Sequence, residues 1–214
     1  MASQLPLAQI TRRYDRLARV YAWLEPLFAI HSGARRRAAR ALGVNSGASV
    51  LEVGCGTGRN FPYLLEAVGP TGRVVGIDAS PGMLAEAQRL IKRHQWSNVE
   101  LHRQDAAELT RGETFDAALF SLSYSVIPAS RTAAHRAWDL LRPGGRLVVM
   151  DAGVPDSALG RILDPVARLL VKLAPGDPYS RPWEDLDDLD APHTERFLLG
   201  IYYVVVITKP AEVP

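Results

Sequence analysis

The chain has 214 residues, of which 47% are hydrophobic and 22% are charged, as in an ordinary globular protein, and this length leaves little room for a second full domain. Its single cysteine, Cys55, excludes an internal disulfide framework and is typical of a reducing cytoplasm. The net charge of +2 conceals an asymmetry, because residues 1–42 hold eight arginines against two acidic residues, and the remainder carries a net charge of −4.

The first predicted element is a helix over residues 12–28, RRYDRLARVYAWLEPLF. Its arginines interrupt the apolar stretch that a cleavable signal peptide needs, so we expect no signal peptide. The longest uncharged run in the chain, residues 117–130, is too short for a membrane-spanning helix, so we expect no such helix. A basic segment on a mildly acidic body indicates either a solvated helix face or an anionic partner, which would be lipid headgroups or nucleic acid.

At about 100° per residue, this helix has two different faces. One face is apolar and aromatic and carries Tyr14, Leu17, Ala18, Tyr21, Leu24 and Phe28. The other face carries Arg12, Arg16, Arg19 and Trp23. We expect Pro26 to end or kink the helix. Our hypothesis is that the tyrosine face closes as a lid over the ligand of the following domain, while the arginine–tryptophan face meets anionic lipid.

From residue 48 onward, short β-rich runs alternate with helical runs, which predicts βαβ units and a parallel sheet. The expected strands are residues 48–53, 72–78, 98–105, 114–123 and 144–152, and the expected helices are residues 59–68, 80–94 and 129–141. Ser80 and Pro81 are placed as the N-cap and first residue of the second of these helices. Two final apolar runs, residues 194–200 and 202–210, predict an antiparallel pair that closes the sheet edge.

The strongest local signal is VLEVGCGTGRN, residues 50–60, where a strand leads into Gly54, Gly56 and Gly58 and then into a helix. Glycines let the backbone turn tightly and leave room for a ligand directly against the peptide groups. The dinucleotide-binding fingerprint G-x-G-x-x-G would need a glycine at position 59, where this chain has Arg59. The motif is therefore a poorer match to a pyrophosphate-binding loop, whereas it remains compatible with a ligand that carries a carboxylate. The alternative to a ligand-binding loop is a purely structural turn, in which Cys55 only fills space in the protein interior.

Acidic side chains follow the second and third strands. Asp78 ends the second strand, where a carboxylate can accept both hydroxyls of a ribose. Asp105 ends the third strand, in a position to reach an adenine amino group, and Met83 can cover the adenine face with a soft side chain. Residues 141–151, LRPGGRLVVMD, then make a tight turn into the fifth strand.

Together these motifs resemble class I S-adenosylmethionine-dependent methyltransferases, over about residues 48–151. The resemblance implies an α/β fold, a Rossmann-like three-layer sandwich with a seven-stranded, mostly parallel sheet and an antiparallel last strand. It implies S-adenosyl-L-methionine as the cofactor and no metal. It places the following residues at the cofactor: Tyr14, Glu52, Gly54, Gly56, Gly58, Asp78, Ala79, Met83, Asp105, Ala106 and Ser121.

The candidate acceptor site follows the fourth strand, in FSLSYSVIP, residues 120–128. Methyl transfer is an in-line displacement that depends mainly on holding the acceptor close and dry, so we expect no catalytic triad. Tyr124, Ser125 and Tyr14 are the candidate catalytic residues, with the Tyr124 ring either facing a cation or simply packing. His135 and His193 are expected to be structural or surface residues rather than bases.

The segments RYDRLARVYAW and VGPTGRVVGIDASPGML resemble the branch that contains ubiquinone/menaquinone C-methyltransferases and bacterial phosphatidylethanolamine N-methyltransferases. The SYSVIP stretch favours N-methylation of a lipid headgroup amine, and methylation of a quinone precursor or another small molecule at carbon or oxygen is the alternative. Relatives often carry Tyr-Asp where this chain has Tyr21 and Ala22, so no role is carried over from that aspartate. An NAD-dependent oxidoreductase and a non-catalytic protein of this fold are the weaker alternatives.

The expected organisation is a helical lid and membrane-facing segment over residues 1–47 and a methyltransferase domain over residues 48–214, with a substrate-side insert at about 155–190. Apolar residues recur in the insert between Arg161, Arg168 and Lys172, so it can lie on a membrane, line an apolar acceptor pocket or pack on the sheet. The acidic run at 184–190 is either a solvated face or attractive to a cationic headgroup. The expected partners are a small-molecule or lipid acceptor and an anionic membrane, not nucleic acid, and the expected location is the cytoplasm, peripherally at the inner membrane surface.

Overall fold

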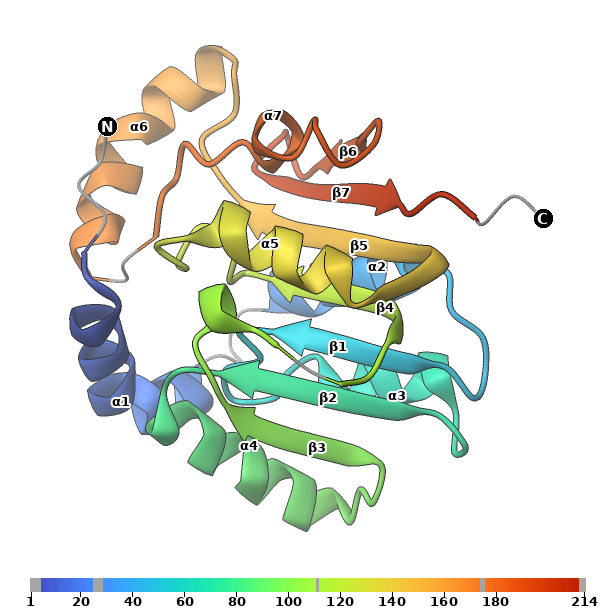
Figure 1. The fold of residues 1–214 in the computed structure, drawn as a ribbon. Helices are drawn as coiled ribbons and strands as arrows, with labels where there is room; N and C mark the ends of the chain where they lie inside the picture. The colour runs from blue at the N-terminus through green and yellow to red at the C-terminus, as the bar shows by residue number, and fades with distance from the viewer. Residues whose placement is uncertain (1–4, 25–28, 111, 174–175, 212–214) are drawn as a thin grey trace.

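A computed structural model describes residues 5–24, 29–110, 112–173 and 176–211 (Figure 1). Within these ranges, the side chains of residues 20–24, 29–32 and 170–173 are not described. Several expectations therefore lie outside the described part of the chain, namely those for Tyr21, Trp23, Leu24, Pro26, Phe28 and Lys172.

The centre of the molecule is one seven-stranded sheet with the order β3-β2-β1-β4-β5-β7-β6. Its strands are β1 (Ser49–Val53), β2 (Arg73–Asp78), β3 (Val99–Arg103), β4 (Phe115–Ser121), β5 (Leu141–Ala152), β6 (His193–Phe197) and β7 (Tyr202–Thr208). All neighbours among the first five strands pair in parallel, whereas β7 runs antiparallel to both β5 and β6. The predicted sheet and its antiparallel last strand are confirmed.

Helices cover both faces of the sheet and complete three layers (Figure 1). One core lies beneath α2 (Ala29–Ala41), α3 (Phe61–Val68) and α4 (Pro81–His94). The other lies beneath α5 (Ser130–Asp139) and the segment around α7 (Pro182–Asp185). Alternate residues of each central strand point into alternate cores, as a strand requires, so β1 is buried along its whole length.

Two helices stand at the edge where the parallel strands end, α1 (Leu7–Leu24) and α6 (Ala158–Leu173) (Figure 1). The first begins five residues before the expected start and packs on α4. The second belongs to the expected insert and contains Pro165, which removes one backbone donor from the helix. Ligands of open parallel sheets bind at this edge, so both helices are placed to influence what binds there.

The RPGG stretch differs from its expected form. Strand β5 already begins at Leu141, and its pairing with β4 shifts register between the Phe115–Leu141 and Ala117–Arg146 pairs. Gly144 has a φ of 78°, and a Cβ on Gly145 would lie 3.0 Å from the carbonyl oxygen of Asp116. The stretch is therefore an irregularity inside the strand rather than a turn before it, and it needs glycine for conformation and for space.

The acidic run near the end of the insert is partly used inside the fold. Asp188 pairs with Arg131 at 3.0 Å, and Asp185 lies 3.3 Å from the Tyr124 hydroxyl. Leu186 is completely buried between them in the core. The run is therefore more than a solvated face, because it anchors the insert against α5.

Candidate functional site

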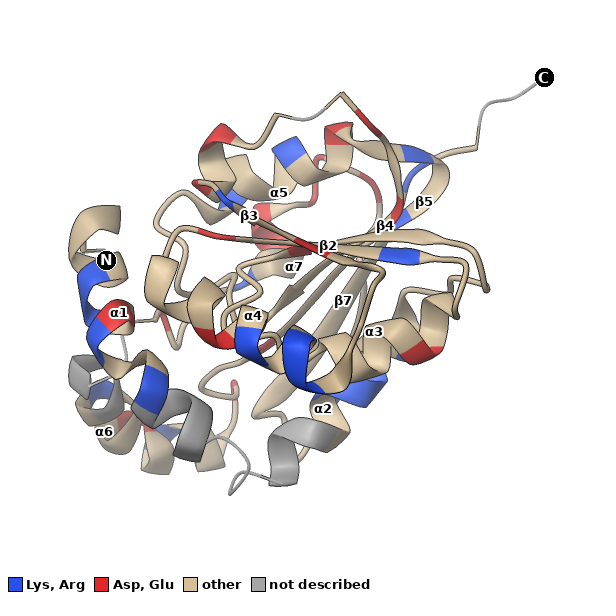
Figure 2. Ribbon diagram, turned by 90° about the horizontal axis from the view of Figure 1, so that it is seen from below, with Lys and Arg blue, Asp and Glu red and all other residues tan. Residues whose placement is uncertain are grey.

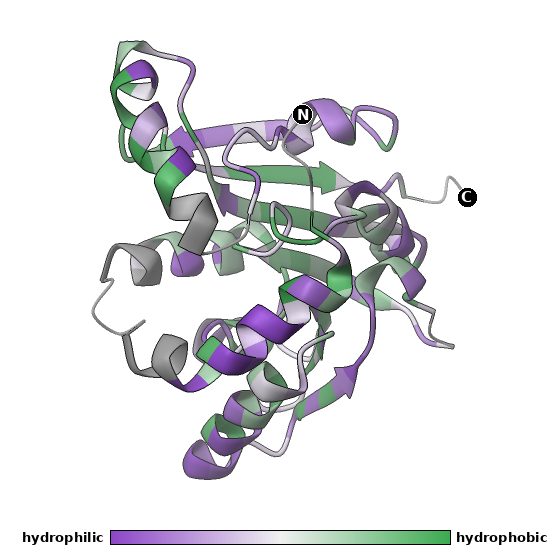
Figure 3. Ribbon diagram, turned by 90° about the vertical axis from the view of Figure 1, so that its left-hand side faces the viewer, coloured by the Kyte–Doolittle hydropathy of each residue, from purple (hydrophilic) through white to green (hydrophobic). Residues whose placement is uncertain are grey.

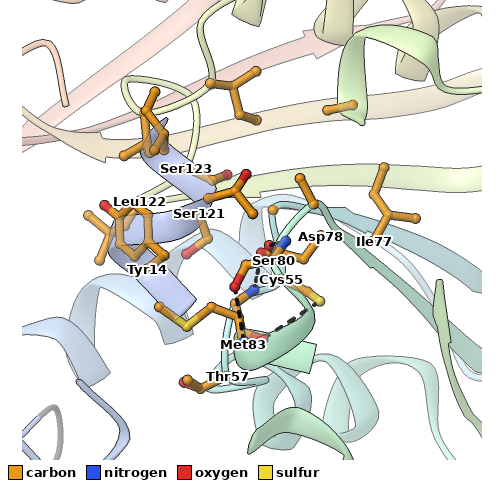
Figure 4. A pocket seen from close by; sticks show the side chains of 18 of the residues that line it. Tyr14, Cys55, Thr57, Ile77, Asp78, Ser80, Met83, Ser121, Leu122 and Ser123 are labelled. Carbon is orange, nitrogen blue, oxygen red and sulfur yellow. Dashed lines mark hydrogen bonds between the residues drawn. The ribbon is translucent and has the colours of Figure 1, made fainter. Parts of the chain in front are cut away.

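A cavity of about 910 Å³, measured to its open mouth, lies at the carboxyl ends of β1, β2 and β4, under α1 (Figure 4). Nine of the residues expected at the cofactor line it: Tyr14, Gly54, Gly56, Asp78, Ala79, Met83, Asp105, Ala106 and Ser121. The remaining two, Glu52 and Gly58, lie behind its wall.

The three glycines after β1 have different tasks. All three have positive φ, between 55° and 80°. A Cβ on Gly54 would lie 2.6 Å from Ser123 Cβ, and one on Gly58 would lie 2.6 Å from the Phe61 ring, so these two glycines are needed for packing. A Cβ on Gly56 would meet no protein atom within 4 Å, because this residue faces open space in the cavity wall. Gly56 therefore leaves a ligand room against the backbone.

The carboxylate of Asp78 is held by the turn it faces. Its two oxygens accept hydrogen bonds from Gly56 N and Ser80 N, both at 2.8 Å. Burial raises the pKa of Asp78 above its usual value, and the nearby Asp15 carboxylate adds to this rise. The hydrogen bonds from the backbone N–H groups lower the pKa but do not cancel the effect of burial. Each carboxylate oxygen can accept more than one hydrogen bond, so both remain able to accept ligand hydroxyls.

Helix α4 begins at the rim of the cavity as the sequence predicts. Ser80 is its N-cap, and the Ser80 hydroxyl accepts a hydrogen bond from Met83 N at 3.1 Å. This cap holds Met83 in the first helical turn, where its side chain lines the cavity and is only 4% exposed. Across the cavity, Asp105 Oδ1 accepts from Ala107 N at 2.9 Å and starts the short 3-10 helix η2 (Ala106–Glu108).

A buried polar network forms part of the cavity floor. Asn60 donates a hydrogen bond to Glu52 Oε1, and Asn60 Oδ1 accepts from Arg35 Nη1 at 3.0 Å and from Ser121 Oγ at 3.2 Å. All four side chains are buried. Glu52 thus acts one layer below the cavity, through Asn60, whereas Arg35 brings a guanidinium into the cavity lining. Burial of a cation at this point favours an anionic ligand group.

Sequence reasoning missed Arg35 and Asn60. They come from different elements, and the folded chain brings them together across 25 positions. Asn60 carried a weak signal, since it directly precedes α3 at the end of the glycine motif. Arg35 is the first of three consecutive arginines, and nothing in the sequence separates it from the exposed Arg36 and Arg37.

The lid face of α1 is partly as expected. Ile10 and Tyr14 line the cavity, and Ala18 is 2% exposed, whereas Leu17 is 41% exposed and does not belong to the covered face. Asp15 fixes this helix, because its carboxylate accepts hydrogen bonds from Ser80 Oγ and Gly82 N at the start of α4. Asp15 was not among the expected site residues.

Two of the expected catalytic residues lie elsewhere. Tyr124 is completely buried, with its ring 5.8 Å from that of Phe120 and its hydroxyl directed to Asp185. Burial raises the pKa of Tyr124, and Asp185 adds to the rise. Ser125 donates its backbone N–H to Asp151 at 2.9 Å and also lies outside the cavity lining. Of the two roles considered for the Tyr124 ring, facing a cation or simply packing, its position in the core agrees with packing.

A backbone turn explains this difference. Leu122, directly after β4, has a φ of 54°, which is uncommon for a residue with a branched side chain. After this turn, four residues line the cavity: Leu122, Ser123, Val126 and Ile127. This side of the cavity is consequently more apolar than SYSVIP suggests.

The remaining candidates have structural surroundings. Cys55 lines the cavity and is 4% exposed, and burial raises the pKa of its thiol, to which Asp78 and Glu52 add, so the thiolate is disfavoured. His135 Nε2 lies 3.4 Å from Asp188, and His193 is exposed on the edge strand. Among the described residues there is no group of histidine, cysteine and acidic side chains arranged to hold a metal. No helix in the described ranges is long and apolar enough to cross a membrane.

Comparisons with known proteins agree with this geometry. Residues 50–145 match the model of a family described as a methyltransferase domain. A demethylmenaquinone methyltransferase from Staphylococcus aureus (strain JH9) is 34% identical over 147 residues, which are 68% of this chain and 58% of that protein. The chain thus spans less than two thirds of the length of this curated relative.

Solved structures show the same fold. A SAM-dependent methyltransferase from Aquifex aeolicus superposes with a TM-score of 0.63 at 19% identity, covering 81% of this chain and 88% of that one. A chain from the complex between the Haloferax volcanii Trm112 methyltransferase activator and the putative methyltransferase gives a TM-score of 0.77 at 14% identity, covering 96% and 99%. At these identities, the likeness concerns the fold alone.

Proposed function

We propose that this chain is an S-adenosylmethionine-dependent methyltransferase that methylates a small amphiphilic acceptor, with a quinone precursor as the favoured class. The match of residues 50–145 to a methyltransferase domain supports the reaction type. The observation that carries this choice is the 34% identity to a demethylmenaquinone methyltransferase. The alternative, a lipid headgroup amine, loses support because the Tyr124 ring is buried and cannot face a cation. The apolar acceptor wall formed by Leu122, Val126 and Ile127 also suits a quinone ring.

The cavity fits the cofactor on three counts. Gly56 leaves open space against the backbone, Asp78 offers acceptors for ribose hydroxyls, and Met83 offers an adaptable apolar side chain for the adenine face. Arg35, which sequence reasoning did not assign, is the matching partner for the carboxylate of the methionine moiety. S-adenosyl-L-methionine, when bound, supplies the electrophilic methyl group.

The residues of the chain would contribute mainly orientation and exclusion of water. The Asn60 network holds Arg35 and Ser121 in fixed positions at the cavity floor, so the bound methionine moiety would keep one orientation. Ile10 and Tyr14 of α1 would cover the reacting groups. An in-line displacement gains most from such alignment, so a dedicated base is not required by the proposal.

The decisive experiment is incubation of the full chain with isotopically labelled S-adenosyl-L-methionine and matched acceptors, followed by mass spectrometry. We expect label in a demethylated naphthoquinol and none in phosphatidylethanolamine. Label in phosphatidylethanolamine alone would replace the quinone proposal with the headgroup one. Calorimetric titration with S-adenosylhomocysteine and with NAD distinguishes the two methyltransferase proposals from an NAD-dependent oxidoreductase. Tight binding of NAD without binding of S-adenosylhomocysteine would contradict any methyl transfer.

We further propose that an anionic membrane surface is a partner. Arg12, Arg16 and Arg19 are exposed along α1, and Figure 2 shows basic residues along this helix. Each arginine close to an anionic bilayer contributes about 1 kcal/mol. Replacing all three with glutamine should therefore lower binding to phosphatidylserine vesicles more than tenfold in a sedimentation assay. The control is Arg136→Gln on α5, and equal binding by the triple variant would show that the arginines are only solvated.

A further inference from the structure

A second cavity lies beside the first, between α6 and the carboxyl end of β5. It measures about 820 Å³ to its open mouth. Its lining is mainly apolar and includes Val154, Leu163, Val166, Ala167, Pro178 and Ile201. None of these residues belongs to the site described above, and three of them come from the α6 insert.

The backbone around this cavity leaves few polar groups for a ligand. Gly153 N donates to Ile201 O, Val154 N donates to Pro178 O, and Asp177 N donates to Ser125 O, each at 2.8 Å. Since these groups are satisfied within the protein, the wall presents mainly carbon. A concave site of this kind suits an apolar ligand much better than a polar one.

The two cavities are separated by adjacent residues of the segment after β4. Val126 lines the first cavity, and its neighbour Ser125 lines the second. A Cβ on Gly176, which lines the second cavity, would lie 3.6 Å from Val126 Cγ2, so the side chain of Val126 reaches the edge of the second cavity. A ligand whose reacting group lies in the first cavity would therefore have apolar surface close by in the second.

The outer side of α6 continues the apolar surface away from the site. Val166 is 54% exposed although it lines the cavity, and Ile162 and Leu169, one turn to either side, are 72% and 60% exposed. Hydropathy along this helix alternates between apolar and charged positions (Figure 3). Apolar side chains so exposed at the mouth of a cavity indicate contact with an apolar ligand.

We propose that this second cavity binds the apolar chain of the acceptor while its head group reaches the methyl-transfer cavity, an assignment that rests on the proposed function. The ligand chemistry is an unbranched or prenyl hydrocarbon chain, which a quinone precursor and a phospholipid both offer. Leu163, Val166 and Ala167 then determine specificity for tailed acceptors. In this proposal, the insert determines which hydrocarbon chain of an acceptor is bound, and the segment after β4 determines which head group is bound.

The test compares acceptors that share one head group and differ only in their chains. Naphthoquinols with zero, one and two isoprene units form one arm, and dihexanoyl and dioleoyl phosphatidylethanolamine in matched micelles form the other. Burial of each additional CH₂ is worth a factor of about four, so one isoprene unit should lower KM at least about tenfold. If KM depends on the length of the hydrocarbon chain in only one of the two acceptor series, that series identifies whether the bound hydrocarbon chain belongs to a quinone precursor or to a phospholipid.

The variant Ala167→Phe fills the cavity and should remove most of this chain dependence. The KM of the tail-less naphthoquinol and the Kd of S-adenosylhomocysteine should not change. Arg161→Phe adds the same ring on α6 outside the cavity and should behave as wild type. Should Ala167→Phe not fold, as judged by its melting temperature, Leu163→Ala provides the second test, since loss of that contact should raise KM for tailed acceptors only.

A readout without turnover keeps the two proposals separate. The fluorescent chain probe cis-parinaric acid should bind wild type and Arg161→Phe, and binding should fall at least tenfold in Ala167→Phe. Probe binding without methylation of any acceptor would contradict the proposed function and leave the chain site standing. Equal probe affinity in Ala167→Phe, or unchanged chain dependence of KM, would overturn the chain site.

Discussion

Asp15 of α1 accepts a hydrogen bond from Ser80 at the start of α4, with 2.5 Å between Asp15 Oδ1 and Ser80 Oγ. The same carboxylate oxygen lies 3.0 Å from Gly82 N, in the first turn of that helix. An anionic group is favourable at a helix N-terminus. The contact therefore fixes α1, the proposed lid, to the turn that carries Asp78 and Met83 to the cavity.

The first prediction concerns this contact. Asp15→Ala should weaken binding of S-adenosylhomocysteine about fivefold, because loss of a partly buried hydrogen bond costs about 1 kcal/mol and frees α1 to leave the cavity. Limited proteolysis should cut α1 faster in the variant, and calorimetry gives the affinity. Arg13→Ala, on the exposed side of the same helix, is the matched control. Identical affinity and protection in both variants would show that the contact does not hold the lid.

The second prediction tests the lid face itself. Tyr14→Ala should lower affinity for S-adenosylhomocysteine about tenfold, since removal of a large apolar contact from a ligand site costs about 1.5–3 kcal/mol. Tyr14→Phe should retain most of the affinity if the ring provides the contact. Leu17→Ala, one turn along on a residue that is 41% exposed, should have no effect. A larger loss from Leu17→Ala than from Tyr14→Ala would mean that another face of α1 covers the ligand.

The third prediction separates two glycines of one motif. Gly56→Ala should abolish detectable binding of S-adenosylhomocysteine, because its methyl group enters the open space in the cavity wall, and its melting temperature should fall less than that of Gly58→Ala, because only the strain of its φ of 55° and no overlap acts on stability. Gly58→Ala should lower the melting temperature by about 5 °C or more, since its Cβ would lie 2.6 Å from the Phe61 ring and overpacking costs about 1–3 kcal/mol. Differential scanning fluorimetry with and without ligand measures both. The reverse ranking would contradict the assignment of Gly56 to the ligand.

The fourth prediction concerns pH and follows from the raised pKa of Asp78. Its carboxylate becomes protonated at a higher pH than an ordinary aspartate, whose pKa is about 3.9, and the protonated form accepts ribose hydroxyls poorly. Affinity for S-adenosylhomocysteine should therefore be constant near neutral pH and should begin to fall on acidification before an ordinary aspartate would titrate. Asp78→Asn should bind at least about tenfold more weakly at pH 7 and show a flatter profile. Parallel profiles for the two proteins would assign the titration to another group.

Local signals were sufficient for most of the fold. Ser80 and Pro81 start α4 where expected, because a cap and a proline act within one helical turn. The five parallel strands and the closing pair follow from apolar runs whose lengths and spacing are set along the chain. The glycine turn and Asp78 were predictable because each stands at the carboxyl end of a strand of the parallel sheet, where ligands bind. The hydrogen bond that joins Gly56 to Asp78 spans 22 positions and follows from the pairing of those two strands.

The sequence by itself determined the fold class and most of the residues that line the cavity at the ends of β1 and β2, whereas only the tertiary structure decided how the segment after β4 and the helices contribute to it. Arg35 and Asn60 meet across 25 positions, and Asp15 reaches Ser80 across 65, distances at which residue spacing carries no signal. Between the two roles that the sequence left open for Tyr124, the tertiary structure decided for packing, because the positive φ of Leu122 turns the chain after β4, so Val126 lines the cavity and the tyrosine enters the core. Periodicity fixes which faces are buried, but the direction of a side chain after an irregular turn depends on what packs against it.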